Sequence, residues 1–258
     1  MSATPAPAEL LAVAIDAARA AGEVLLDRYE RSSGPVDVRS KSTATDLVSE
    51  ADIAAERAIR ELLAARRPGD AILGEEGDDV PGTTGLRWIV DPLDGTVNYL
   101  FGIPEWCVSV CCEERAGVIW DPVRDELFAV AAGERPTLGG EPLRPSSRED
   151  LATALVATGF GYDAEVRAQQ AEVVARLLPR VRDIRRLGSA ALDLAWTAAG
   201  RYDAYYERGV KTWDVAAGAM LCAAVGLEVR GLPARDGMTP GILAAPAGLA
   251  EPLLELVG

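Results

Sequence analysis

The sequence predicts a layered α/β or α+β protein, a sandwich in which helices pack against sheets. Short apolar strands follow one another directly between residues 106 and 131, whereas strands alternate with helical segments between residues 154 and 223. The chain has 258 residues and is 49% hydrophobic, which suffices for a large buried core. We therefore expect a single domain, 1–258, with lobes of about 1–140 and 141–258.

The first part of the chain predicts two helices, a hairpin and a strand. Apolar residues recur at helical spacing from about residue 8 to residue 29. Short alternating segments flank a polar stretch within residues 36–49, which is typical of a hairpin. Ser49 is a candidate N-cap for the next helix, and residues 71–74 form the expected strand.

The segment 88–96 reads Trp-Ile-Val-Asp-Pro-Leu-Asp-Gly-Thr, and it contains most of the predicted chemistry. Its apolar start fits a buried strand, and Pro92 predicts that this strand ends at Asp91, because proline cannot extend a hydrogen-bonded ladder. The turn can then aim Asp91 and Asp94 at one point, with the backbone N–H groups of Gly95 and Thr96 beyond. Such carboxylates suit a metal-bridged phosphate, although Asp-Pro and Asp-Gly also occur in ordinary turns.

The remaining elements follow from the same patterns. Strands are expected near 106–113, 116–121 and 126–131, followed by a Pro/Gly-rich crossing at 133–145, a strand at 154–157, a helix at 164–178, a strand at 182–187, a helix start at 188–190, a strand at 203–207 and a helix at 212–223.

The absence of histidine excludes several kinds of active site. It removes Ser-His and Cys-His nucleophiles, histidine general bases and the H-E-x-x-H metalloproteases. Oxygen ligands then favour hard ions such as Mg²⁺ or Mn²⁺. The cysteines lack metal-ligand spacing, and we expect buried thiols rather than a zinc site at Cys107, Cys111, Cys112 and Cys222.

The net charge of −14 argues against binding to nucleic acid or to an anionic membrane. It would also repel a phosphate substrate, so a phosphatase would need bound cations to reverse the local charge. The sequence has no run of eighteen apolar residues, and its start lacks the features of a signal peptide. A cytoplasmic location is therefore expected.

Six segments together resemble the inositol monophosphatase family, part of the magnesium-dependent, lithium-sensitive sugar phosphatase superfamily. The resemblance covers nearly the whole chain and implies a fold of alternating helix and sheet layers. The segments are Lys41 with Asp46-Leu47-Val48-Ser49 and Asp52, Gly74-Glu75-Glu76, Asp91-Pro92-Leu93-Asp94-Gly95-Thr96, Gly188-Ser189-Ala190-Ala191, Asp203-Ala204-Tyr205-Tyr206-Glu207 and Trp213-Asp214-Val215-Ala216-Ala217-Gly218.

The resemblance implies a metal site and catalytic residues. One magnesium ion would be held by Glu75, Asp91 and the carbonyl of Leu93, and a second by Asp91, Asp94 and Asp214; a third ion on Glu75 and the use of manganese are also possible. Thr96 would orient the attacking water while its hydroxyl donates to Asp52, and Lys41 would lie near the metals. Taken alone, Asp52 and Asp214 could equally be carboxylates that stabilise helix starts.

The resemblance also implies a substrate, inositol-1-phosphate or a similar polyol monophosphate, and a possible homodimer. Glu207 would accept ring hydroxyls, while Gly188, Ser189 and Ala190 line the same pocket and the N–H groups of Gly95 and Thr96 hold the phosphate. The same scaffold also hosts histidinol-phosphate phosphatases, fructose-1,6-bisphosphatases and nucleotide 3′-phosphatases, so the substrate stays open. A regulatory binding protein without catalysis is the alternative outside the enzymes.

Overall fold

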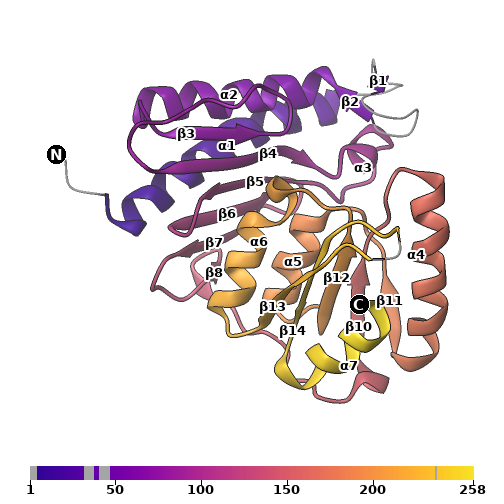
Figure 1. The fold of residues 1–258 in the computed structure, drawn as a ribbon. Coiled ribbons are helices and arrows are strands. Elements are labelled where there is room, and N and C mark those ends of the chain that lie inside the picture. Colours follow the sequence, from indigo (N-terminus) through magenta and orange to yellow (C-terminus); the bar gives the residue numbers. More distant parts are fainter. Residues whose placement is uncertain (1–4, 32–37, 41–46, 236) are drawn as a thin grey trace.

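The protein is a stack of alternating helix and sheet layers, as predicted (Figure 1). The structure is a computed structural model that describes residues 5–31, 38–40, 47–235 and 237–258. From the upper side of Figure 1, the layers are helices α1 (Pro7–Arg31) and α2 (Glu50–Arg66), a seven-stranded sheet, helices α5 (Ala190–Ala198) and α6 (Thr212–Ala224), a five-stranded sheet, and helices α4 (Ala164–Leu177) and α7 (Ala247–Val257).

The seven-stranded sheet contains the strands expected from the first half of the chain. Its strand order follows the sequence, with β3 and β4 parallel and the other neighbours antiparallel. The strands are β3 (Ala71–Gly74), β4 (Arg87–Asp94), β5 (Cys107–Cys112), β6 (Ala116–Asp121), β7 (Glu126–Ala131), β8 (Thr137–Leu138) and β9 (Glu141–Pro142). The last two lie in the segment for which only a Pro/Gly-rich crossing was expected.

Both faces of this sheet are buried because helices cover each of them. Trp88 and Val90 belong to the core beneath α1 and α2, whereas the intervening Ile89 belongs to the core shared with α5 and α6. This alternation explains why the central strands read as continuous apolar runs. All four cysteines are free and buried, which confirms the expected buried thiols.

Strand β4 does not end at Asp91, and that prediction was wrong. Asp91 pairs with Ser109, the register shifts, and the strand resumes with Asp94 opposite Cys107. Within the shift, the N–H of Leu93 donates to Asp91 Oδ1 at 3.0 Å. Pro92 interrupts the ladder as expected, but a local bulge absorbs the interruption, so the strand continues by three residues.

The five-stranded sheet has the order β11-β10-β12-β14-β13. Its strands are β10 (Leu155–Thr158), β11 (Asp183–Arg185), β12 (Ala204–Arg208), β13 (Glu228–Leu232) and β14 (Gly241–Ala245). The alternation of strands with α4, α5 and α6 confirms the predicted pattern, whereas β13, β14 and α7 were not predicted. The chain changes sheet between Pro142 and Leu155, and the division into lobes near residue 140 stays a prediction.

The shorter elements complete the described chain. The expected first helix is α1, and α2 begins directly after Ser49. The predicted hairpin supplies an antiparallel pair, although its tip, including Lys41, lies outside the described residues. These elements are β1 (Val38–Ser40), β2 (Leu47–Ser49), α3 (Thr96–Leu100), η1 (Leu151–Thr153) and η2 (Leu178–Arg180). No helix in the described ranges is long and apolar enough to cross a membrane.

Candidate active site

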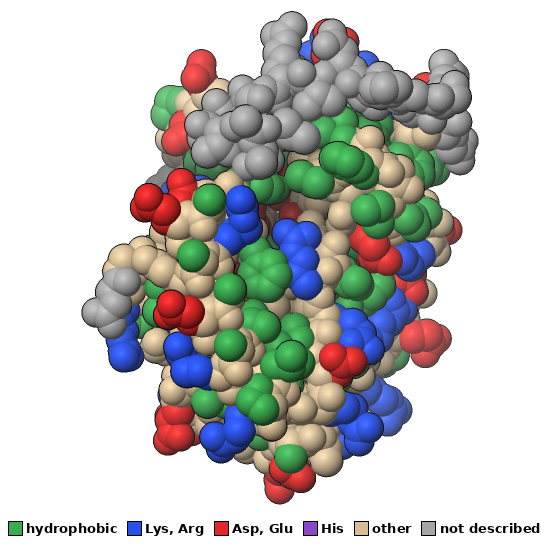
Figure 2. Space-filling model, turned by 90° about the vertical axis from the view of Figure 1, so that its right-hand side faces the viewer, with side chains coloured by type: hydrophobic (Ala, Val, Ile, Leu, Met, Phe, Trp, Pro, Cys, Tyr) green, Lys and Arg blue, Asp and Glu red, His purple; other side chains and the backbone are tan. Residues whose placement is uncertain are grey.

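A pocket of about 410 Å³ lies where β4, β12 and the starts of α3, α5 and α6 come together. Figure 2 shows this face of the molecule, with acidic side chains at the bottom of a hollow and basic and hydrophobic side chains around it. The pocket is lined by Glu75, Asp91, Leu93, Asp94, Gly95, Thr96, Phe160, Gly161, Tyr162, Asp163, Arg186, Gly188, Ala190, Glu207, Arg208, Gly209, Val210, Lys211, Trp213 and Asp214.

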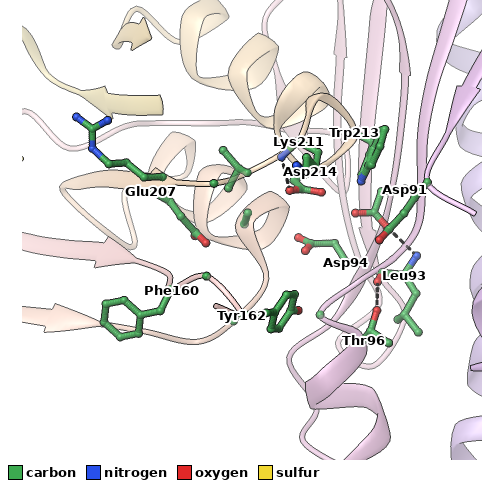
Figure 3. Close-up of a pocket in the computed structure, with 18 of the residues that line it drawn as sticks. Asp91, Leu93, Asp94, Thr96, Phe160, Tyr162, Glu207, Lys211, Trp213 and Asp214 are labelled. Carbon is green, nitrogen blue, oxygen red and sulfur yellow. Dashed lines mark hydrogen bonds between the residues drawn. The ribbon is translucent and has the colours of Figure 1, made fainter. Parts of the chain in front are cut away.

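Three carboxylates from two distant segments meet at one end of this pocket. Asp91 and Asp94 lie on either side of the bulge in β4, and Asp214 lies in the first turn of α6. Figure 3 shows the three side chains pointing toward a common space. Asp214 is held in place because its Oδ2 accepts the backbone N–H of Lys211 at 2.6 Å.

The environment of these carboxylates disfavours their charged forms. Burial raises the pKa of Asp91, and the charges of Glu75, Asp94 and Asp214 raise it further. Burial likewise raises the pKa of Asp94 to about 6 and that of Asp214 well above its ordinary value. Like charges this close together require neutralisation, either by protons or by cations.

Asp94 is supported by the N-terminus of α5, from the other half of the chain. Its Oδ2 accepts from the hydroxyl of Ser189 at 2.7 Å and from the N–H of Ala191 at 2.6 Å. The same serine is the N-cap of α5 and is buried. Ser189 was predicted to line the substrate pocket; the structure instead places its hydroxyl against Asp94, where it orients a carboxylate.

Thr96 and Asp52 form the pair that was predicted. The hydroxyl of Thr96 lies 3.1 Å from Asp52 Oδ1 and 3.0 Å from the carbonyl oxygen of Leu93. Asp52 is almost fully buried at the start of α2, behind Thr96. Gly95 precedes α3 with φ 99°, and a Cβ at this position would lie 2.7 Å from the carbonyl oxygen of Glu105. Glycine is therefore required there.

Glu56 shapes the loop that contains Glu75, and sequence reasoning missed it. Its buried carboxylate accepts the N–H of Glu76 at 2.7 Å and that of Gly77 at 2.9 Å. Arg60 donates to the same carboxylate at 2.7 Å. Glu56 stands one helical turn after Asp52, so both acids face the site from α2; this i, i+4 spacing was the available signal.

The opposite end of the pocket contains Glu207 at the end of β12. Its carboxylate points into the same cavity as the three aspartates (Figure 3). Burial raises the pKa of Glu207 to about 7. The guanidinium of Arg186 also lines this region and lies 5.8 Å from the centre of the Phe160 ring.

The pocket wall formed by residues 160–163 was not predicted. Gln170 of α4 accepts the N–H of Gly161 at 2.9 Å and donates to the carbonyl of Arg208 at 3.3 Å, thereby joining this wall to β12. Tyr162 projects from the wall toward the cavity (Figure 3). The available signal for Gln170 was its helical spacing with Val173 and Leu177, which places it on the apolar face of α4.

The carboxylate and carbonyl oxygens of this pocket suit hard divalent cations, although the side chains are not preorganised as a complete coordination shell. Within the described ranges, no group of three Asp, Glu, His or Cys side chains could hold a metal ion as it stands. The clustered carboxylates nevertheless raise one another's pKa. Their oxygens, with the nearby carbonyl of Leu93, are the ligands that magnesium prefers.

The chain matches the inositol monophosphatase family over residues 6–257. The chain belongs to this family. It is 43% identical to "Inositol-1-monophosphatase SuhB" of Mycobacterium tuberculosis, over 96% of this chain and 93% of that protein. It is also 43% identical to "Nus factor SuhB" of Xylella fastidiosa, over 83% of this chain and 78% of that protein. The solved structure of extragenic suppressor protein suhB from Bartonella henselae matches with a TM-score of 0.88 and 33% identity, covering 96% and 98% of the two chains.

Most residues predicted from the resemblance to inositol monophosphatases come together in one place. Asp52 supports Thr96 from behind, Ser189 supports Asp94, and Lys41 lies outside the described residues. The predicted residues that line the pocket are Glu75, Asp91, Leu93, Asp94, Gly95, Thr96, Gly188, Ala190, Glu207 and Asp214.

Proposed function

We propose that this inositol monophosphatase family member is a magnesium-dependent phosphomonoesterase that hydrolyses inositol-1-phosphate or a similar polyol monophosphate. The observation that carries the proposal is the division of one pocket into two ends. Clustered carboxylates lie beside Thr96 at one end, and the carboxylate of Glu207 lies at the other. A phosphate at the first end would direct the hydroxyl groups of its ester toward the second.

The metal ions would be held by the carboxylates at the first end. Glu75, Asp91 and the carbonyl of Leu93 would bind one ion, Asp91, Asp94 and Asp214 a second, and Glu75 a weaker third. Bound magnesium would supply a Lewis acid that lowers the pKa of water and offsets the charge on the leaving oxygen. Manganese has the same ligand preference and could replace it.

Thr96 and Asp52 would orient the attacking water. When the Thr96 hydroxyl donates to Asp52, at the observed 3.1 Å, its oxygen lone pairs remain available to accept a hydrogen bond from water. The carbonyl of Leu93 is then also available as a ligand. This arrangement replaces a histidine base in a chain that has no histidine.

The remaining residues would hold the substrate. The backbone N–H groups of Gly95 and Thr96 lie at the metal end and would donate to phosphate oxygens. Glu207 would accept hydrogen bonds from ring hydroxyls, and Gly188 and Ala190 leave room for the ring. An acidic residue at this end disfavours a second phosphate, which argues against fructose-1,6-bisphosphate.

Release of inorganic phosphate tests the substrate class. We would compare inositol-1-phosphate, histidinol phosphate, fructose-1,6-bisphosphate and a nucleotide 3′-phosphate, each with magnesium and with chelator. We expect magnesium-dependent turnover that is fastest on inositol-1-phosphate. A preference for histidinol phosphate would replace the substrate but keep the site, whereas no turnover of any ester would reject the enzymatic function.

A second candidate is a regulatory binding role without catalysis. The observation that favours it is the name of the Xylella relative, "Nus factor SuhB". The net charge of −14 favours a protein partner over direct binding to nucleic acid. This role predicts that an Asp91→Asn variant keeps its partner binding while losing any phosphatase activity.

Lithium inhibition, a homodimer and a cytoplasmic location also stay predictions.

A further inference from the structure

Tyr205 lies beneath the substrate end of the pocket and contacts its acidic residue. Tyr205 and Glu207 are two positions apart on β12, so their side chains leave the same face of the sheet. The ring of Tyr205 is fully buried in the core shared with α5 and α6. Its hydroxyl donates to Glu207 Oε2 at 3.0 Å. The buried ring thus fixes one oxygen of a carboxylate that reaches the cavity.

Gly159 bounds the same carboxylate from the neighbouring loop. A Cβ atom at this position would overlap Cδ and both carboxylate oxygens of Glu207. The backbone at Gly159 is not left-handed, so another residue could adopt its conformation. A side chain at position 159 is therefore disfavoured because it would clash with the Glu207 carboxylate, and not because of backbone strain.

We propose that Tyr205 and Gly159 are positioning residues that together orient Glu207 toward the hydroxyl groups of a polyol substrate. The expected effect of these residues on catalysis rests on the proposed function. The hydroxyl of Tyr205 donates to one oxygen of the carboxylate, and the missing side chain at Gly159 allows the carboxylate to pack against that backbone position. The other oxygen then remains to accept a hydrogen bond from the substrate.

Two substitutions disturb this arrangement in different ways. Tyr205→Phe removes the hydroxyl while keeping the buried ring, so the core stays filled. Gly159→Ala pushes the flexible end of Glu207 away from position 159. Neither residue lies among the carboxylates expected to bind metal, so both variants should keep magnesium-dependent hydrolysis of an ester without ring hydroxyls.

The chain offers a matched control for each substitution. Tyr206→Phe changes the adjacent tyrosine, which faces the opposite core under α4 and α7. Gly231→Ala adds a Cβ at an exposed position of β13 that does not line the pocket, and this Cβ would meet no other atom within 4 Å. Steady-state kinetics on inositol-1-phosphate and on p-nitrophenyl phosphate then separate positioning of the polyol from general damage.

The expected result is a selective change in KM. Tyr205→Phe and Gly159→Ala should each raise the KM for inositol-1-phosphate about tenfold, which is the effect of losing one hydrogen bond to a charged group. Their kinetics on p-nitrophenyl phosphate should stay within about twofold of the wild type, and the controls should resemble the wild type on both esters. Equal losses on both esters, or no loss on either, would overturn the inference.

Crystal structures of the two glycine variants give a readout that does not depend on activity. The carboxylate of Glu207 should move away from position 159 in Gly159→Ala and stay in place in Gly231→Ala. An unmoved carboxylate in Gly159→Ala would reject the positioning role, whatever the kinetics show. If the wild type hydrolyses neither ester, the proposed function fails, whereas the position of Glu207 in these structures still decides the inference.

Discussion

The hydroxyl of Ser189 donates to Asp94 Oδ2 at 2.7 Å, across 95 positions of sequence. This bond joins β4 of the seven-stranded sheet to the N-terminus of α5. The same hydroxyl accepts the N–H of Leu192 at 3.3 Å and thereby caps the helix. One side chain thus connects the two halves of the chain and orients a proposed metal ligand.

Replacement of Ser189 by alanine should therefore lower stability. The substitution removes a helix cap and leaves Asp94 with one donor fewer, which together cost about 1–2 kcal/mol. Urea unfolding of the metal-free protein measures the free energy of unfolding. The exposed Ser147→Ala serves as the control, and a Ser189→Ala variant as stable as this control would contradict the assigned contacts.

Thr96→Val should lower kcat about 100-fold because it removes the hydroxyl proposed to orient water while keeping the shape of the side chain. Asp52→Asn should have a similar effect, and the two changes should not add, since the residues act as one unit. The rise in melting temperature on adding magnesium should persist in both variants. Near-normal kcat in Thr96→Val would remove this residue from the mechanism.

Glu56 is not a proposed metal ligand, but Glu56→Gln should still weaken magnesium binding about tenfold. An amide in its place cannot accept both N–H groups of the loop after Glu75, so this loop loses part of its support. Calorimetric titration measures the affinity. Glu61→Gln on the same helix is a fitting control because the side chain of Glu61 is 73% exposed. Equal affinities in the two variants would argue against the supporting role.

The pH dependence of stability follows from Glu207. Burial raises its pKa from an ordinary value of 4.5 to about 7, the charge of Asp94 adds to this rise, and the Tyr205 hydrogen bond and Arg186 oppose it. The folded state therefore binds this proton more tightly than the unfolded chain, and its contribution to stability is lost as the pH rises from about 4.5 to about 7.

Metal-free wild type and Glu207→Gln should consequently differ in their pH profiles. The free energy of unfolding should fall more steeply in the wild type across this range, because glutamine has no proton to lose. Denaturant unfolding in the presence of chelator measures both profiles. Parallel profiles would show that the pKa of Glu207 is not raised in the folded protein.

Local patterns in the sequence predicted the meander of β5, β6 and β7 and the alternation of strands and helices after it. They failed where long-range contacts override local signals. The bulge in β4 depends on Asp91 accepting the N–H of Leu93, which the proline alone does not indicate. Helix α7 contains Pro252 within its span, contrary to the usual effect of proline.

The clustered carboxylates of the pocket were predicted, whereas two residues that support its loops, Glu56 and Gln170, were missed. Asp91, Asp94 and Asp214 stand in motifs whose resemblance to a family could be recognised. Glu56 and Gln170 lie in amphipathic helices, where a polar residue ordinarily faces solvent. Only the folded arrangement shows that each binds backbone groups of a pocket loop.

Magnesium-dependent turnover of inositol-1-phosphate tests the proposed phosphatase activity most directly. Phosphate release would be followed against magnesium concentration for the wild type and for Asp91→Asn, which keeps the shape of the side chain but removes the charge shared by both proposed ions. We expect saturable, chelator-sensitive turnover in the wild type and a loss of at least about 100-fold in the variant. Turnover that is independent of magnesium, or unchanged in Asp91→Asn, would contradict it.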